Sequence, residues 1–367
     1  MREYWQKRPL LLRQALPGYA GPLTVPSLLE LAQRDDVESR IVRRIGQRWT
    51  VDHGPFTKMS ACDRGAWTLL VQGVNLHLAA GDALLRRFDF ISQARLDDLM
   101  ISYASPGGGV GPHVDSYDVF LLQTLGRRRW RISSQTDHTL VPGAALKILK
   151  DFRVEQEWIL EPGDMLYLPP HYAHDGTALD ACTTCSIGFR APAHDELMRE
   201  FFYTLAEGIE PSGRYSDAGR QPTRTPARMD DHMVDTLAAK LAAVRWSRAD
   251  VAAFLASHLS EPKPQVFFDH PKSAMSVARF TASARRRGLR LHPKTVMLYT
   301  TGTICINGED LAKTIPAHAL TALREPLHKL ANERKLDDKT CQRYLFDQAA
   351  LPALLQTWHA HGWITLA

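Results

Sequence analysis

The pattern of hydrophobic and polar positions divides the chain into three segments. In residues 1–205, short apolar runs are bounded by Gly, Pro and Asp, a pattern typical of β-strands. In residues 206–262, a stretch rich in Gly, Pro, Ser, Thr and Arg precedes apolar residues at helical spacing. Residues 263–367 contain both kinds of pattern. We therefore predict a β-rich first domain with an N-terminal lead-in, a linker with helices, and a small C-terminal domain.

The middle segment predicts two helices between Met233 and Leu259. Ser247, followed three residues later by Asp250, resembles a capping box that starts the second helix. So short an element cannot bury its apolar faces by itself, and it must dock on the first domain or on a second copy of the chain. We expect the second arrangement, a homodimer formed through residues near 230 to 260.

The last segment predicts a small α+β module of winged-helix type. Val296–Glu309 has the pattern of a hairpin with glycines at its turns. Helices are predicted over residues 320–330 and 348–361, and Gly362 ends the second of them before a terminal strand.

In the first segment, a predicted hairpin directs one arginine inward. The apolar run Tyr117–Gln123 leads to a turn at Gly126, and period-two alternation of the returning strand places Arg128 with Trp130 and Ile132 on one face. A buried guanidinium is costly unless it meets an anion, and a carboxylate matches its planar fork. The alternative is an arginine whose stem packs while its head reaches solvent.

Just before this hairpin, two candidate metal ligands are separated by one residue. His113 and Asp115 would project from the same face of an extended strand. His174 follows a turn and a short apolar strand that Pro169–Pro170 ends. Two histidines and one carboxylate form the ligand set of non-haem Fe(II) oxygenases, which leaves coordination positions open. His171 is the alternative to His174 as the third ligand.

Composition limits the class of protein. The chain has 367 residues, 44% hydrophobic and 23% charged, as is ordinary for a globular protein of two or three domains. Its net charge of +5 is modest, so we do not expect direct nucleic-acid binding. Five scattered cysteines argue against a disulfide framework and for a reducing compartment. The N-terminal apolar run, Leu10–Leu12, is too short for a signal peptide or a membrane span, which predicts a cytoplasmic protein.

The two ligand segments are similar to the two motifs of the cupin barrel. Five residues separate Gly107 from His113 in the first motif, and five separate Gly163 from Pro169 in the second, whose spacing selects His174 over His171. Asp115 replaces the usual second histidine, and the usual glutamate is missing. These departures indicate the JmjC-type oxygenases that use 2-oxoglutarate. We expect the glycines at 107–109 to form a flexible approach to the metal strand.

Longer stretches resemble the bacterial ribosomal oxygenases, strongly up to about residue 200. These stretches are YWQKRPLL at 4–11, WTLLVQ at 67–72, GPHVDSYDVFLLQ at 111–123, PGDMLYLPP at 162–170 and SIGFRAP at 186–192. The resemblance implies an α+β chain: a double-stranded β-helix (the cupin/JmjC jelly roll) over 1–205, a helical dimerisation region over 206–262, and a winged-helix-like module over 263–367.

The same resemblance implies the chemistry. His113, Asp115 and His174 would bind Fe(II), Arg128 would bind 2-oxoglutarate, and dioxygen would be the second cosubstrate. The substrate would be an arginine of a large-subunit ribosomal protein, hydroxylated at its β-carbon with release of succinate and carbon dioxide. A 2-oxoglutarate oxygenase acting on another protein or a small molecule is the alternative, and a metal-free cupin is a third possibility.

Three further residues are candidates for the site. Ser186 either donates a hydrogen bond to the cosubstrate or is a core serine. Tyr117 and Asp118 follow the ligand Asp115 closely enough to stand near the metal and bind the substrate. The Asp118 carboxylate would grip a guanidinium bidentately, or it would only cap the hairpin.

Overall fold

The computed structural model describes all residues except 47, 57–64, 211–212 and 348–349, so Cys62 and Gln348 lie outside the described residues. The chain forms two compact units. The first comprises residues 1–191, 262–296 and 332–367, and the second comprises residues 192–261 and 297–331. The segment 263–367 is thus divided between the units, and the division into three domains stays a prediction. Among the described residues, no helix has the length and apolar character needed to cross a membrane.

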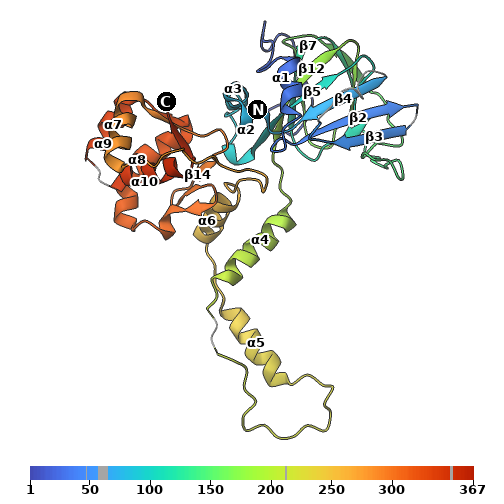
Figure 1. The fold of residues 1–367 in the computed structure, drawn as a ribbon. Helices are drawn as coiled ribbons and strands as arrows, with labels where there is room; N and C mark the ends of the chain where they lie inside the picture. Colours follow the sequence, from blue (N-terminus) through green and yellow to red (C-terminus); the bar gives the residue numbers. More distant parts are fainter. Residues whose placement is uncertain (47, 57–64, 211–212, 348–349) are drawn as a thin grey trace. The chain divides into compact units, whose positions relative to one another are not determined.

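Two antiparallel sheets form the barrel of the first unit (Figure 1). The larger sheet has the order β1-β10-β7-β12-β5-β4-β2-β3, and the smaller has the order β6-β11-β8-β9. From β5 to β12 the chain crosses repeatedly between the sheets, which confirms the predicted double-stranded β-helix. The strands are β1 (Leu10–Leu12), β2 (Ser39–Ile45), β3 (Arg48–His53), β4 (Ala66–Val71), β5 (Leu96–Ala104), β6 (His113–Val114), β7 (Val119–Leu125), β8 (Arg128–Ser133), β9 (Gln156–Leu160), β10 (Met165–Leu168), β11 (Ala173–Ala178) and β12 (Cys182–Phe189).

The barrel strands are apolar because both faces of the larger sheet are covered. Every residue of β12 is buried. Short helices pack with the N-terminal part of this sheet: α1 (Val25–Leu31), α2 (Val74–His77) and α3 (Ala79–Arg86). On β8, Arg128, Trp130 and Ile132 are buried, whereas Arg129 and Arg131 are partly exposed. The predicted alternation of this strand is confirmed.

The glycine-rich segment before β6 is closely packed. A Cβ atom on Gly108 would lie 2.3 Å from the carbonyl oxygen of Trp67, and one on Gly109 would lie 2.5 Å from that of Gly176. The prediction that the glycines make this segment flexible is therefore wrong, because they are needed for close packing. These glycines let the backbone pass against neighbouring strands and thereby fix the entry to β6.

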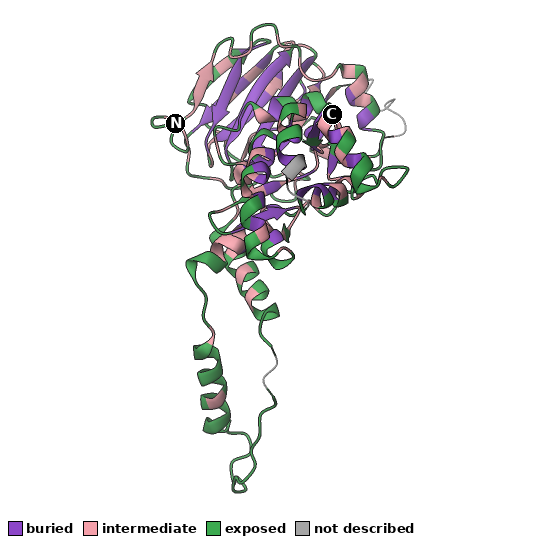
Figure 2. Cartoon of the chain, turned by 90° about the vertical axis from the view of Figure 1, so that its left-hand side faces the viewer, coloured by how far each residue is buried: buried purple, intermediate pink, exposed green. Residues whose placement is uncertain are grey.

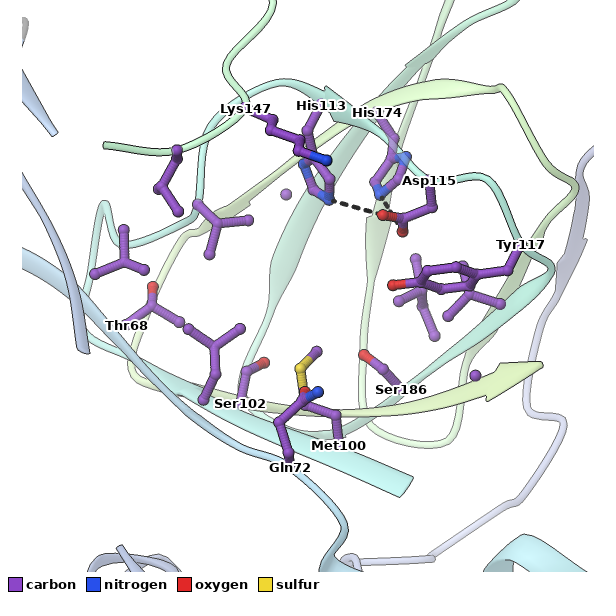
Figure 3. A pocket seen from close by; sticks show the side chains of 18 of the residues that line it. Thr68, Gln72, Met100, Ser102, His113, Asp115, Tyr117, Lys147, His174 and Ser186 are labelled. Carbon is purple, nitrogen blue, oxygen red and sulfur yellow. Dashed lines mark ion pairs between the residues drawn. The ribbon is translucent and has the colours of Figure 1, made fainter. Parts of the chain in front are cut away.

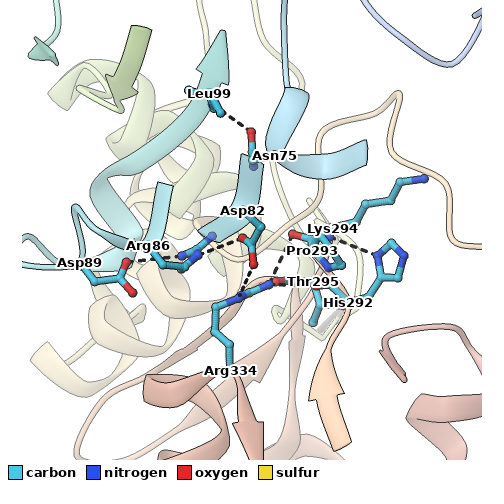
Figure 4. A network of polar contacts seen from close by, with 10 residues as sticks. All are labelled: Asn75, Asp82, Arg86, Asp89, Leu99, His292, Pro293, Lys294, Thr295 and Arg334. Atoms are coloured by element: carbon cyan, nitrogen blue, oxygen red, sulfur yellow. Dashed lines mark hydrogen bonds and ion pairs between the residues drawn. The ribbon is translucent and has the colours of Figure 1, made fainter. Parts of the chain in front are cut away.

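The rest of the first unit is a helical module with a three-stranded sheet, β17-β13-β18. Buried Arg334 holds its loops: its guanidinium donates to the carbonyl oxygens of His292 and Thr295, both at 2.9 Å. Its Nε lies 3.7 Å from a carboxylate oxygen of Asp82 on α3 (Figure 4). The elements are α7 (Val277–Arg287), β13 (Leu289–Leu291), β17 (Lys335–Leu336), α9 (Asp338–Asp347), α10 (Ala350–Ala360) and β18 (Ile364–Leu366).

The second unit contains helices and the predicted hairpin. Ser247 and Asp250 form the predicted capping box at the start of α6. The helices α4 and α5 have no buried residue, as the green ribbon in Figure 2 shows. The elements are α4 (His194–Glu207), α5 (Asp231–Ala243), α6 (Arg248–His258), β14 (Met297–Tyr299), β15 (Ile304–Ile306), β16 (Glu309–Asp310) and α8 (Ala317–Glu333), of which residues 332–333 belong to the first unit.

Candidate metal centre

Strand pairing brings the two predicted histidine ligands together. His113 on β6 is the direct cross-strand partner of His174 on β11, and their ring centroids are 4.2 Å apart. Asp115 follows β6, and its carboxylate oxygens lie 3.9 Å from Nε2 of His113 and 3.6 Å from Nε2 of His174 (Figure 3). Within the described part of the chain, these three form the only such group of potential metal ligands.

Backbone carbonyls orient both imidazole rings. Nδ1 of His113 lies 2.9 Å from the carbonyl oxygen of Gly111, and Nδ1 of His174 lies 2.9 Å from that of Tyr172. When each Nδ1–H donates to its carbonyl, each Nε2 presents a lone pair to the centre of the group. Burial, reinforced by the neighbouring His113, lowers the pKa of His174 to about 4. This ring is therefore neutral near pH 7, as a metal ligand must be.

The three side chains form one wall of a cavity of about 430 Å³ inside the barrel. Side chains from both sheets complete it, and Figure 3 shows several of them pointing inward. A cavity of this size accommodates a small cosubstrate together with one side chain of a substrate. Tyr117 and Ser186 line it, as expected of site residues.

Arg128 is the cationic group of this cavity. Its side chain lies among the lining residues, and the residue is only 5% exposed. One guanidinium nitrogen donates to the hydroxyl of Ser102 at 3.3 Å, whereas the buried Nε and Nη2 have no hydrogen-bond acceptor among the described residues. Unsatisfied buried donors of a charged group are costly. The geometry therefore fits a carboxylate ligand that would accept from Arg128.

Asp118 does not line the cavity. The residue is 0% exposed, and its carboxylate accepts hydrogen bonds from Tyr167 Oη at 2.7 Å, Gln6 Nε2 at 3.0 Å and Arg95 Nη2 at 3.1 Å. The preceding residue, Tyr117, lines the cavity, whereas Asp118 lies in the network behind it. The prediction that Asp118 grips a substrate is contradicted, because this carboxylate is already saturated within the core.

Three residues of β5 that sequence reasoning missed face the cavity. Asp98, Met100 and Ser102 lie two residues apart and all line it. Asp98 accepts a hydrogen bond from the backbone N–H of Gly73 at 2.9 Å, and burial, with the neighbouring Asp97, raises the pKa of its carboxyl. Their period-two spacing was the available signal.

His171 lies apart from the metal group. The residue is exposed, does not line the cavity, and has a φ of +66°, a left-handed conformation that favours glycine. Its backbone N–H donates to the carbonyl oxygen of Asp115 at 2.8 Å. His171 therefore shapes the turn beside the ligand Asp115 without offering its imidazole to the centre.

A double-stranded β-helix whose cavity joins a 2-His-1-carboxylate group to an unmatched arginine defines the class of non-haem Fe(II) oxygenases. Comparison with protein families agrees. The JmjC domain family matches residues 83–197, and the ROXA-like winged helix family matches residues 243–365. A third match, to the AraC-like ligand binding domain over residues 152–244, runs from β9 into the second unit.

Individual relatives narrow the class to one family. The ribosomal protein uL16 3-hydroxylase of Escherichia coli is 38% identical over 65% of this chain, and the probable ribosomal oxygenase of Haemophilus influenzae is 38% identical over 52%. These matches span 64% and 49% of the two relatives, less than two thirds of each.

Solved structures match over nearly the full length. The structure of E. coli ycfD has a TM-score of 0.85 at 30% identity, covering 100% of this chain and 96% of that chain. A structure of the same E. coli ribosomal oxygenase in complex with cobalt and 2-oxoglutarate has a TM-score of 0.81 at 30% identity, covering 99% and 96%. The chain therefore belongs to the ribosomal oxygenase family of JmjC-domain proteins.

Proposed function

We propose that this protein is an Fe(II)- and 2-oxoglutarate-dependent oxygenase that hydroxylates the β-carbon of an arginine in a large-subunit ribosomal protein. One observation carries the proposal: the group of His113, Asp115 and His174 shares a cavity with the unmatched guanidinium of Arg128. The E. coli relatives support it, since one is named for uL16 3-hydroxylation and another binds cobalt with 2-oxoglutarate.

Each residue has a separate task in this reaction. His113, Asp115 and His174 hold Fe(II), which when bound supplies the activation of dioxygen coupled to conversion of 2-oxoglutarate into succinate and carbon dioxide. Arg128 binds the distal carboxylate of 2-oxoglutarate, and its hydrogen bond to Ser102 restricts the orientation of the guanidinium. Ser186 lies in the same cavity and donates to the cosubstrate.

For the substrate, we propose that Asp98 takes the role first expected of Asp118. Asp98 is buried on the cavity wall, and only one of its carboxylate oxygens, Oδ2, has a hydrogen-bond donor among the described residues. A carboxylate in this position can pair with a substrate guanidinium and direct the β-carbon towards the metal. Tyr117 lines the same cavity and packs along the aliphatic part of the substrate side chain.

Asp98→Asn is expected to lower hydroxylation of a ribosomal-protein peptide by about ten- to a hundredfold, because a hydrogen bond to a charged group is lost. The asparagine oxygen still accepts from the Gly73 N–H, so the fold should persist. Mass spectrometry would measure peptide hydroxylation, and NMR would measure succinate formed without peptide, which should continue. The exposed carboxylate variant Asp52→Asn is the matched control. Unchanged peptide hydroxylation by Asp98→Asn would show that this residue does not bind the substrate. Equal turnover of a peptide with lysine in place of the target arginine would contradict recognition of a guanidinium group.

The proposed reaction can be tested in cells. Intact masses of the large-subunit ribosomal proteins should show one protein heavier by a single oxygen atom when the gene is present than when it is deleted. Fragmentation of that protein should place the oxygen on an arginine β-carbon. Identical masses in both strains would contradict the proposed substrate class.

We further propose that the protein is a homodimer formed through residues near 230 to 260, chiefly α5, and we extend the predicted interface to α4. On α5, Val234, Leu237 and Leu241 follow helical spacing and are 50%, 57% and 63% exposed. On α4, Met198 and Phe202 are also exposed. Apolar stripes of this kind on helices without buried residues need a partner surface, and a second copy supplies an identical one.

Leu237→Glu combined with Leu241→Glu is expected to convert the dimer into a monomer, because two charges would be buried without partners in the interface. Sedimentation equilibrium would measure the mass. The matched control is Asp235→Glu on the same helix, which keeps the charge. A wild-type monomer, or a double variant that remains dimeric, would contradict this interface.

A further inference from the structure

A second cavity of about 180 Å³ lies beside the catalytic one, within the first unit. One wall comes from α2 and the residues before it, including Gln72 and Leu76. The other wall comes from residues 263–269 and Lys294 of the C-terminal module. None of the site residues predicted from the sequence lies in this cavity, and of its lining only Asp98 has a part in the proposed reaction.

The two cavities share part of their lining. Gln72 and Asp98 belong to both, so the two cavities adjoin at these residues. Figure 3 shows Gln72 on the side of the catalytic cavity opposite the metal group. Its side-chain amide makes no hydrogen bond within the described residues, so it remains available to a polypeptide passing between the cavities.

Polar contacts hold the C-terminal wall in place. Lys263 Nζ lies 2.9 Å from a carboxylate oxygen of Asp97 on β5, which joins the wall to the barrel. Lys294 Nζ donates to the carbonyl oxygen of Phe267 at 2.8 Å. Arg334 fixes the carbonyls on both sides of Lys294, those of His292 and Thr295 (Figure 4). The second cavity therefore has a fixed shape.

The lining carries an excess of negative charge. Four carboxyl groups against two lysines give a formal net charge of −2 with His77 neutral, and of −1 when Asp98, whose pKa burial raises, is protonated; burial lowers the pKa of His77. Asp36 is paired with Arg34 at 2.5 Å and Lys263 with Asp97, so neither leaves a free charge in the lining, whereas Glu38 and Asp269 have no ion pair among the described residues. The four carboxylates are Asp36, Glu38, Asp98 and Asp269. An unneutralised acidic lining favours a cationic group.

We propose that this second cavity binds a lysine or arginine side chain of the substrate polypeptide, a few residues from the arginine that enters the catalytic cavity. The inference rests on the proposed function and extends it by one specificity subsite. A cavity of about 180 Å³ has room for one long side chain. The exposed ring of Phe267 gives the aliphatic stem of that side chain an apolar contact.

A charge cycle between enzyme and peptide tests the subsite. The enzyme is full-length protein, as wild type and as Glu38→Gln/Asp269→Asn. The probe is an unmodified uL16 peptide from the same genome that contains the target arginine, with each other lysine or arginine replaced in turn by glutamine. One replacement should raise the peptide KM about tenfold on wild type and less than twofold on the double variant, because the coupled charges are lost together. The kcat and the KM for 2-oxoglutarate should not change.

Controls separate this subsite from the rest of the proposal. Glu210→Gln/Asp217→Asn removes two exposed carboxylates elsewhere and should behave like wild type. Two results would overturn the subsite. In one, the double variant has the same peptide KM values as wild type. In the other, its KM rises by the same factor for the parent peptide and for every replaced peptide. Calorimetric Kd values for the same enzymes and peptides give the same comparison of charge changes without requiring catalysis. If no peptide is hydroxylated by wild type, the proposed function fails, and the Kd cycle still decides whether the cavity binds a cation.

Discussion

Alanine in place of His113, Asp115 or His174 is expected to abolish Fe(II)-dependent succinate formation. Each residue supplies one of the three ligand atoms that lie within 4.8 Å of one another, and the described residues place no fourth potential ligand in this group. Loss of one ligand leaves two, which hold a metal ion weakly and no longer set three open positions on one face. NMR detection of succinate, together with calorimetric binding of Mn(II), would measure both consequences.

His171→Ala is the control for the metal group. It should keep a substantial part of the activity, since the imidazole is exposed and does not line the cavity. Any activity that alanine loses should return in His171→Gly, because glycine adopts the left-handed φ of +66° without strain. An inactive His171→Ala beside an active His174→Ala would overturn the ligand assignment.

Arg128→Ala is expected to raise the concentration of 2-oxoglutarate required for half-maximal turnover by on the order of thirtyfold to a few thousandfold. The range corresponds to the roughly 2–5 kcal/mol lost when a buried hydrogen-bonded charge pair is truncated. The physical reason is that two donors of this guanidinium have no acceptor within the described protein. Steady-state kinetics with 2-oxoglutarate as the varied substrate would measure the change.

The neighbouring arginines are matched controls for this prediction. Arg127 forms an exposed ion pair with Asp180 at 2.9 Å, and Arg129 lies on the opposite face of β8. Arg127→Ala and Arg129→Ala should therefore change the 2-oxoglutarate requirement less than threefold, in keeping with the small value of surface pairs. Equal effects from all three substitutions would contradict the assignment of Arg128 to the cosubstrate.

The alternation of side chains along a strand predicted which residues point into the barrel wherever the sequence also showed where the strand begins. Arg128 could be placed because a glycine turn on one side and the alternating Trp130 and Ile132 on the other fix its register. Asp118 could not be placed in this way, because it precedes β7 by one residue and a slip of one position reverses the face of an extended chain. The core network around Tyr167, which saturates Asp118, depends on a strand 49 residues away.

Contacts between residues far apart in the chain also could not be predicted from the sequence. The cavity beside Gln72 forms because residues 263–269 return to the barrel nearly two hundred residues later, and no local pattern encodes that return. The division of residues 263–367 between two units likewise depends on tertiary contacts. By contrast, the capping box at Ser247 was predicted correctly because its two partners are three residues apart.

Because β6 is short, a metal ion bound by its histidine would help to hold this strand in the sheet. This strand has two residues and pairs only with β11, so little backbone bonding holds it in the smaller sheet. An ion gripped by His113 and His174 would fasten chain positions that are 61 residues apart in the sequence. It would act as a reversible cross-link that stabilises the folded state by mass action, because the ligand atoms come together only in that state. Because Cys182 and Cys185 of the barrel are both free thiols, the bound ion would provide a cross-link between strands that these cysteines do not.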